Sequence, residues 1–447
     1  MKLKKKQLTP LQMITCAFAA LVLAGTLLLS LPAAARSGEA VPFVDALLTS
    51  TSASCVTGLV VYDTYTHWSM FGQIVILLLI QVGGIGIITL SMYFLSMVHA
   101  KIGMRHRLAM QESIGASSTR GVVRMTRFIA AGVLLIEGIG AVLLSFSFIP
   151  EFGFAKGCYF AVFHSVSAFC NAGFDLMGEE TPFASLSGYA GNPYVCTIIM
   201  MLIMIGGLGF FVWRDLKNNG FRFKRYALHT KVVVVTSGIL IFGGALFFFL
   251  LSYDSAAQAD RSVGERALIS LFQSVSARTA GFSTADLSQI GGGAQMLMIC
   301  LMLVGGSPGS TAGGIKTTTI AVLFLLVRSI FRRKEDVECF GRRVDRPVIR
   351  TAIAVFVLYL FLALAAGIAV SALEDIDILA ALFETVSAMA TVGLSLSVTP
   401  ELGPLSKIIV TVLMFLGRVG GLTVLLSLSR SRQTPAGRCP VENIAVG

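Results

Sequence analysis

The sequence predicts an all-α integral membrane protein made of four tandem repeats, with eight transmembrane helices. Of its 447 residues, 55% are hydrophobic and only 13% are charged, about half the charged share of a typical soluble domain. Apolar runs of about 20 residues recur along the chain, and a short Ser/Thr/Gly-rich motif recurs between them. A run of that length crosses a hydrocarbon core of about 30 Å as a helix. Only helices or closed barrels satisfy the backbone in lipid, and unbroken apolar runs favour helices.

The Lys and Arg residues are unevenly placed, and this orients the predicted helices. The formal net charge is +11, and 27 of the 35 basic residues lie in the N-terminus, three alternate connections and the C-terminal tail. These segments are residues 1–6, 99–127, 214–231, 328–350 and 430–438. By the positive-inside rule they lie in the cytoplasm, so we expect both termini there and an even number of crossings. This distribution argues against nucleic acid as a partner.

The eight cysteines and the N-terminal segment indicate no further chemistry. Neither a C-x-x-C pair nor a zinc-ligand spacing occurs, so we interpret the cysteines as small apolar residues. The basic N-terminus and first apolar run resemble a signal peptide, but the repeat pattern requires this helix, so we expect it to remain. The five histidines are scattered, and we assign them neither a transition metal nor catalysis.

A Ser/Thr-rich motif that ends near a glycine occurs four times. Its copies are residues 48–59, 163–174, 272–282 and 383–394. Their shared glycines, Gly58, Gly173, Gly281 and Gly393, are 115, 108 and 112 residues apart, and the third copy is one residue shorter. Each copy follows one apolar run and precedes another. Repetition at this spacing predicts four copies of one structural unit.

Each unit is predicted to contain a helix, a re-entrant loop and a second helix. Only about 10–14 residues of helix fit before each glycine, which is too few to span the membrane. The predicted units are residues 1–105, 106–220, 221–345 and 346–447, the last including the tail. All four share one orientation, unlike inverted-repeat transporters. We therefore expect four helix–pore loop–helix repeats around a pseudo-fourfold central pore.

The triplet that ends in each glycine suits a monovalent cation. Non-helical backbone at membrane depth must be buried or line water, and four such loops can present carbonyl oxygens that replace a hydration shell. Glycine supplies the backbone torsions that this requires, and the short helices direct their negative C-terminal ends at the cavity. The candidate ion-binding residues are Val56, Thr57, Gly58, Asn171, Ala172, Gly173, Thr279, Ala280, Gly281, Thr391, Val392 and Gly393.

On these motifs and the paired apolar runs, the chain resembles the Ktr/Trk/HKT superfamily of potassium transporters over essentially its full length. One helix before the first motif resembles the Ktr-type membrane (pore) subunit. Because all four triplets end in glycine, the resemblance implies K⁺ as the transported ion, with no cofactor in this chain and Na⁺ open as an activator or co-ion. Asn171 and the short third copy depart from the pattern and leave the number of ion sites open.

The second apolar run of the third unit is interrupted by glycines and serines. Because Ile315 separates Gly314 from Lys316 and a strand context is missing, the segment does not match a nucleotide-binding P-loop. Pro308 and the glycines are expected to break the helix, and the resemblance implies an intramembrane gate of about residues 305–316 below the triplets. The candidate gate residues are Gly305, Gly306, Ser307, Pro308, Gly309, Ser310, Thr311, Ala312, Gly313, Gly314, Lys316 and Arg418.

The other second runs, at 74–98, 194–212 and 408–428, also contain glycine clusters. Small residues let membrane helices pack closely. We interpret five of these glycines in this way: Gly83, Gly84, Gly206, Gly207 and Gly209.

Four charged residues lie within or beside the predicted membrane segments. Arg418, which costs about 2.5–3.5 kcal/mol or more at a helix centre, is expected to form an electrostatic barrier or gate latch, or to anchor loop carbonyls. Arg278 is interpreted as a structural brace rather than a pore-lining charge, and its pairing with Glu384 is a geometric hypothesis. Glu137 is interpreted as a helix-packing hydrogen bond rather than an ion-handling group.

The function that the resemblance implies is K⁺ uptake across the cell (plasma) membrane through a channel-like pore. A sodium-selective or non-selective transporter of the same architecture is the main alternative, and a membrane-embedded enzyme or receptor is the alternative from another class. The resemblance further implies a homodimer in membrane lipid and a cytosolic RCK-type regulatory subunit that binds ATP, ADP or NADH. We do not expect this chain to be an enzyme.

Overall fold

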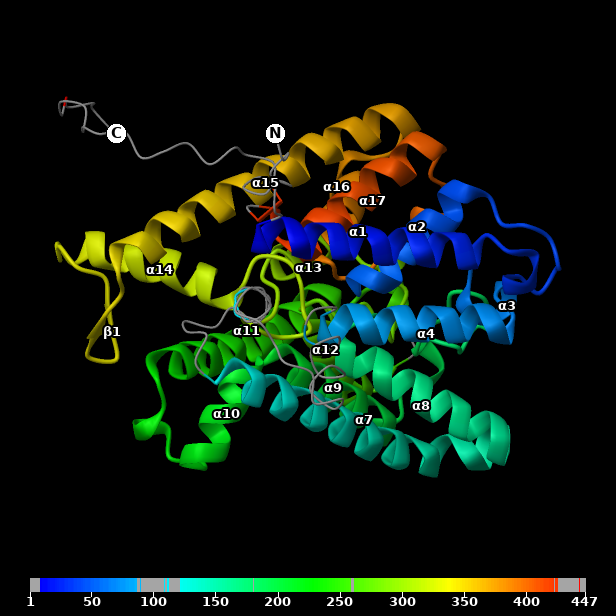
Figure 1. Cartoon of the computed structure of the whole chain (residues 1–447), viewed down its shortest axis with the longest axis horizontal. Coiled ribbons are helices and arrows are strands. Elements are labelled where there is room, and N and C mark those ends of the chain that lie inside the picture. The colour runs from blue at the N-terminus through cyan, green and yellow to red at the C-terminus, as the bar shows by residue number, and fades with distance from the viewer. Residues whose placement is uncertain are drawn as a thin grey trace, which may run out of the picture.

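The computed structural model describes residues 9–86, 121–179, 181–258 and 261–421, with isolated positions at 89, 108, 111, 423, 424 and 442. The N-terminal basic cluster, most of the 99–127 connection and the basic residues of the tail lie outside the described residues. The described part of the chain is mostly helical (Figure 1), which confirms the predicted helical class.

Four long apolar helices are α1 (Pro10–Leu29), α7 (Val122–Phe152), α11 (Leu228–Ser252) and α15 (Arg346–Glu374). Each is long and apolar enough to cross a membrane. The start of α1 is fixed by a capping box, in which Thr9 and Gln12 satisfy each other's backbone N–H groups; such a cap supplies acceptors for orphan donors of the first turn.

Four shorter helices follow them: α2 (Phe43–Cys55), α8 (Phe154–Cys170), α12 (Val263–Ser276) and α16 (Ile378–Ala390). Each is tied to the preceding long helix through one hydroxyl group that donates to a backbone carbonyl. The four pairs are Ser50 with Val22 (2.7 Å), Ser165 with Glu137 (2.7 Å), Ser274 with Ile241 (2.7 Å) and Thr385 with Ala363 (3.3 Å). A glycine of the long helix lies beside each hydroxyl, at positions Gly25, Gly140, Gly244 and Gly367, where a Cβ would collide with a neighbouring side chain.

A third set of helices completes the pattern: α4 (Met70–Ile85), α9 (Pro193–Gly207), α13 (Gly292–Met302) and α17 (Pro404–Val419). Two of them are followed by further helices, α10 (Phe210–Asn219) and α14 (Thr317–Phe331). The continuous run predicted over 194–212 is wrong, because α9 and α10 meet at 96°. The physical cause is that Gly209 adopts φ +91°, a conformation that only glycine reaches easily.

The same device ends α4 and α17, where Gly86 has φ +89° and Gly420 has φ +94°. The predicted interruption of the third unit is present, since residues 303–316 separate α13 from α14. In the part of the chain that the structure describes, four helices qualify as membrane spans, or five if the bent pair counts as one. The expected number of eight spans therefore stays a prediction.

Among the described residues, the remaining elements are short and lie in connections. They are α3 (Thr64–His67), the 3₁₀ helices η1 (Pro32–Ala34), η2 (Ser187–Tyr189), η3 (Phe223–Arg225), η4 (Ala256–Gln258), η5 (Leu287–Gln289) and η6 (Thr399–Glu401), and the strands β1 (Glu338–Cys339) and β2 (Arg342–Arg343). The two strands pair as an antiparallel hairpin.

The helices close into a ring, because each helix of the third set packs on the short helix of the next part of the chain. The contacting pairs are α4 with α8, α9 with α12, α13 with α16, and α17 with α2. The last pair joins the C-terminal quarter to the N-terminal quarter, and orange α17 accordingly lies near blue α1 and α2 in Figure 1. The four loops that follow the short helices are thereby brought to one centre.

Candidate ion pore

The four candidate triplets share one backbone conformation. Their first residues, Val56, Asn171, Thr279 and Thr391, adopt φ of 56°, 60°, 71° and 52°, in the left-handed region. Their glycines, Gly58, Gly173, Gly281 and Gly393, adopt φ of 98°, 69°, 80° and 93°. The one-residue deletion in the third copy does not disturb this, since it falls between the end of α12 and Thr279. Left-handed residues are rare outside glycine, so four in register indicate one shared loop design.

The four glycines form a closed ring of close backbone approaches. A Cβ built on each would meet the middle carbonyl oxygen of the next triplet, whose residue is Ala172, Ala280, Val392 or Thr57. The distances are 2.6 Å from Gly58 to Ala172 O, 2.9 Å from Gly173 to Ala280 O and 2.5 Å from Gly281 to Val392 O, and the Gly393 position would overlap Thr57 O. No side chain fits at these positions without moving the backbone.

One serine of each motif braces the loop from behind. These are Ser52, Ser167, Ser276 and Ser387, none of which the sequence analysis singled out. Ser52 and Ser387 accept from the N–H of Gly58 and Gly393, both at 3.0 Å. Ser167 donates to Phe174 O at 2.6 Å and Ser276 donates to Phe282 O. Their identical place in all four copies is the signal that could have identified them.

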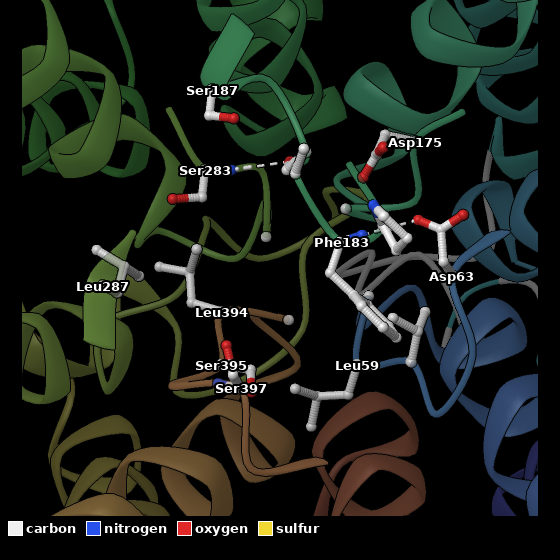
Figure 2. Close-up of a pocket in the computed structure, with 18 of the residues that line it drawn as sticks. Leu59, Asp63, Asp175, Phe183, Ser187, Ser283, Leu287, Leu394, Ser395 and Ser397 are labelled. Carbon is white, nitrogen blue, oxygen red and sulfur yellow. Dashed lines mark hydrogen bonds between the residues drawn. The ribbon is translucent and has the colours of Figure 1, made fainter. Parts of the chain in front are cut away.

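An outer pocket of ≈ 590 Å³ lies directly over the ring and is lined by all four glycines. Figure 2 shows this pocket, with Asp63 and Asp175 on one wall and Ser395 and Ser397 on another. Four of its lining residues are acidic, one from the loop region of each copy: Asp63, Asp175, Asp286 and Glu401. Among the described residues that line it, none is Lys, Arg or His.

The charge of Asp175 is sensitive to its surroundings. Burial raises the pKa of this carboxyl group, and the nearby carboxylate of Asp63 acts in the same direction. Together they bring the pKa to about 7, against a hydrogen bond from the N–H of Met177. Asp63 itself accepts from the N–H of Phe183 at 3.0 Å, the contact drawn in Figure 2. The pocket therefore carries a negative charge that depends on pH near neutrality.

The candidate gate segment, residues 305–316, lies on the other side of the triplets. It contacts residues that precede the glycines, whereas the outer pocket is lined by the glycines and residues after them. Thr311 donates to Phe169 O at 3.1 Å, and a Cβ on Gly314 would lie 2.7 Å from Ala390 O. The segment is held by hydrogen bonds from Ser307 N to Gly207 O (3.0 Å) and, between its two ends, from Gly305 N to Ile315 O (2.8 Å).

Arg418 joins the gate segment to the first quarter of the chain. Its guanidinium group donates to Thr311 O of the segment, and to Gly83 O and Gly84 O of α4 at 2.5 and 2.9 Å. Lys316 instead donates to a carbonyl oxygen of its own segment, Ala312 O, at 2.7 Å. The contacts of Arg418 fit a latch and a hydrogen-bond anchor for loop carbonyls equally well.

The hypothesis that Arg278 pairs with Glu384 is wrong. Arg278 donates to Ser237 at 3.2 Å and Thr317 at 3.3 Å, which confirms the brace between α11 and α14. Glu384 instead accepts from residues that follow its own triplet. Arg278 bonds residues 41 and 39 positions away along the chain, and Glu384 bonds the loop that follows its own helix, so opposite charge alone did not identify their partners.

Two further expectations concern packing. Glu137 accepts a hydrogen bond from Gln81 at 2.8 Å, which confirms the helix-packing interpretation. Close packing is also confirmed at Gly83 and Gly206, where a Cβ would overlap Ser54 O and Phe169 O, and at Gly84, where it would lie 2.6 Å from Cys170 Sγ. A Cβ on Gly207 would make only an ordinary contact, 3.6 Å from Asn171 Nδ2, so close packing does not require glycine there. At Gly209 the packing interpretation is incomplete, because this glycine also bends the chain.

Comparison with known proteins places these features in one family. The family model described as TrkH, cation transport protein, matches residues 5–437. The chain is 38% identical to the potassium/sodium uptake protein NtpJ of Enterococcus hirae, over 99% of this chain and 98% of that protein. It is 35% identical to the Ktr system potassium uptake protein B of Bacillus subtilis, over 97% and 96%.

A solved structure shares the fold. The crystal structure of the potassium transporter TrkH from Vibrio parahaemolyticus superposes with a TM-score of 0.74 over 96% of this chain and 86% of that chain, at 20% sequence identity. The chain therefore belongs to the TrkH family of cation transport proteins and is a transporter rather than an enzyme.

Proposed function

We propose that this chain takes up K⁺ through a central pore whose selectivity filter is the ring of four triplets. The observation that carries the proposal is the closed ring of Gly58, Gly173, Gly281 and Gly393 beneath a pocket with four acidic residues. Carbonyl oxygens at such a ring replace the hydration shell of a monovalent cation. The proposed filter residues are Val56, Thr57, Gly58, Asn171, Ala172, Gly173, Thr279, Ala280, Gly281, Thr391, Val392 and Gly393.

The electrostatics of the site favour a cation over an anion. All four short helices end at the triplets, and a helix C-terminus carries a partial negative charge. The acidic groups of the outer pocket raise the local concentration of cations before they reach the ring. Both features act on any monovalent cation, so the preference for K⁺ must come from the triplets themselves.

The gate of this pore is proposed to be the segment Gly305–Lys316 held by Arg418. The segment contacts the second, third and fourth triplets or the residues just before them, and Arg418 connects it to α4 of the first unit. Because the segment contacts three units and is linked to the first through Arg418, we propose that it blocks the ion path until it moves. Arg418 adds a positive charge, which repels cations while it faces the path.

The finer architecture is also part of the proposal. Four units, residues 1–105, 106–220, 221–345 and 346–447, supply eight spans around a pseudo-fourfold axis, with both termini cytoplasmic in the plasma membrane. The names of the Ktr system relatives support K⁺ as the ion and assembly with further subunits. We propose a homodimer that docks an RCK-type subunit binding ATP, ADP or NADH on its basic cytoplasmic face.

A sodium-permeable transporter is the second candidate. The relative from Enterococcus hirae is named a potassium/sodium uptake protein, and Asn171 departs from the threonine and valine of the other triplets' first positions. In this alternative Na⁺ passes the same ring or acts as a co-ion. The two candidates differ in the measured preference between the ions.

The test is rubidium uptake into liposomes that hold the purified chain, with Na⁺ or K⁺ as competing ion. Gly281→Ser places a Cβ 2.5 Å from Val392 O at φ +80° and is expected to abolish the preference for K⁺. Gly138→Ser is the matched control, because nothing lies within 4 Å of its Cβ position. If Na⁺ and K⁺ inhibit rubidium uptake equally in the unmodified chain, the second candidate is favoured. If Gly281→Ser keeps the preference for K⁺, the proposed filter is contradicted.

A further inference from the structure

The carboxylate of Glu384 is buried behind the fourth triplet, and no role in transport has been assigned to it above. Its side chain is fully buried in α16. Oε1 accepts from Ser395 Oγ at 2.5 Å and from the N–H of Leu396 at 3.0 Å, and Oε2 accepts from Thr399 Oγ1 at 2.6 Å. A buried charge is tolerated only when its hydrogen bonds are satisfied, and these three donors all come from one segment.

That segment is the outgoing arm of the fourth loop, residues 394–401. It runs directly from Gly393 to η6, and it lines the outer pocket through Leu394, Ser395 and Ser397. Its backbone is held in an unfavourable conformation, since Ser397 adopts φ +68°. Such a conformation persists only where the surroundings impose it, and Glu384 supplies three of the contacts that do so.

The same position of the motif performs a related task in two other units. His164 Nε2 accepts from the N–H of Leu176 at 3.3 Å, and Gln273 Nε2 donates to Ser283 Oγ at 2.8 Å. Both partners lie two or three residues beyond the triplet glycine. In the first unit Thr49 instead donates to Asp45 O of its own helix. Glu384 is thus the one charged member among these four equivalent positions, and it makes the most bonds to its arm.

We propose that Glu384 is a positioning residue for ion selectivity, which fixes the Thr391-Val392-Gly393 carbonyls by clamping the outgoing arm from behind. The inference rests on the proposed function, because it assumes that the four triplets select the ion. The carboxylate touches no ion, and it acts through the arm. Without it, the bond that α16 still makes to the N–H of Gly393 is that of Ser387, and the ring can relax toward a size that also admits Na⁺.

The choice of a carboxylate has a chemical reason. Two hydroxyl groups and one N–H converge on it, and an ionised carboxylate accepts at both oxygens. Hydrogen bonds to a charged acceptor are shorter and stronger than neutral ones. In Glu384→Gln, one oxygen still accepts from Leu396 and Ser395, while the new NH₂ group faces Thr399, whose hydroxyl group can turn to accept. The amide therefore retains part of the clamp, and Glu384→Ala retains none.

The experiment measures rubidium uptake into proteoliposomes with K⁺ or Na⁺ as competitor, for the unmodified chain and for Glu384→Gln and Glu384→Ala. The preference for K⁺ over Na⁺ is expected to fall on the order of tenfold or more in Glu384→Ala, the equilibrium factor that one charge-assisted hydrogen bond corresponds to. Glu384→Gln is expected to lose less. The matched control is Glu374→Gln, whose carboxylate accepts from Gly403 N at 2.9 Å at the far end of the same connection and should leave the preference unchanged.

A second variant covers the case in which Glu384→Ala does not fold. Ser395→Ala combined with Thr399→Val removes two donors from the outgoing arm and keeps the carboxylate. The same loss of preference is expected. The inference is overturned if the unmodified chain selects K⁺ and either folded Glu384→Ala or the double variant keeps its ratio. A chain that shows no preference before any substitution would contradict the proposed function itself.

Discussion

Replacement of Arg418 by alanine tests the proposed gate at a single group. The guanidinium group makes one contact to the gate segment, through Thr311 O, and two to α4, through Gly83 O and Gly84 O. Only the first of these restrains the segment. Arg418→Ala should therefore release the segment, while the triplets keep their geometry, because the hydrogen bonds of Arg418 go to Thr311, Gly83 and Gly84 instead.

The expected magnitude follows from that one bond. A hydrogen bond with one charged partner contributes about 1.5–3 kcal/mol, and each 1.4 kcal/mol is a factor of ten in an equilibrium constant. The ratio of open to closed segments should thus rise about 10- to 150-fold. Flux rises by the same factor until the open state predominates, and by less thereafter. Loss of the positive charge near the path acts in the same direction.

The assay is the initial rate of rubidium uptake into liposomes, normalised to folded protein, with competition by Na⁺ measured in parallel. Arg418→Lys is the matched variant: it keeps the charge but cannot reach three carbonyls with a planar fork, so an intermediate rate is expected. The preference for K⁺ should be the same in all three proteins. An unchanged rate in well-folded Arg418→Ala would refute the latch, and a changed ion preference would place Arg418 in the filter instead.

Two further predictions concern packing and pH. Gly140→Ala places its Cβ 2.5 Å from Ser165 Oγ and 2.8 Å from Leu202 Cδ2, whereas the Cβ of Gly138→Ala on the same helix meets nothing within 4 Å. Thermal unfolding in detergent should therefore show that only Gly140→Ala is destabilised, by about 1–3 kcal/mol. Equal stability of the two would contradict the packing of α7 on α8. Because burial raises the pKa of Asp175 to about 7, protonation below that pH removes a negative charge from the outer pocket, and uptake from low K⁺ should decline as the pH falls through 7. Asp175→Asn should remove this dependence, and a pH profile that the substitution leaves unaltered would show that Asp175 does not control entry.

The sequence was sufficient for the features that recur. The apolar runs and the four motifs predicted the helices and placed all four glycines in equivalent positions, including Gly281 after the one-residue deletion, because hydrophobic periodicity and backbone torsion are local properties. The braces Ser52, Ser167, Ser276 and Ser387 also recur, but a serine in a polar motif has many possible partners, and only the folded loop selects one.

The sequence was insufficient where a single glycine sets the direction of the chain or where a distant contact sets the partner of a side chain. Hydrophobic composition continues across Gly209, so the run of 194–212 looks unbroken although the chain turns by 96° there. The partners of Arg278 come from α11 and the start of α14, and those of Glu384 come from residues 395–399 of the loop that follows its own helix. The bonds of Arg278 join residues 41 and 39 positions apart, which no motif spacing encodes, whereas bonds from the Glu384 position to its own loop recur at His164 and Gln273. The guess that two opposite charges would meet was wrong.

The most direct test of the central claim is to locate the ion. Crystals of the protein grown or soaked with Rb⁺ in place of K⁺ would reveal the cation by anomalous scattering. We expect a peak enclosed by the triplets of all four units, at the level of Gly58, Gly173, Gly281 and Gly393, which weakens when Rb⁺ is exchanged for Na⁺. An empty ring, with ordered Rb⁺ along another route through the protein, would contradict the four-triplet filter.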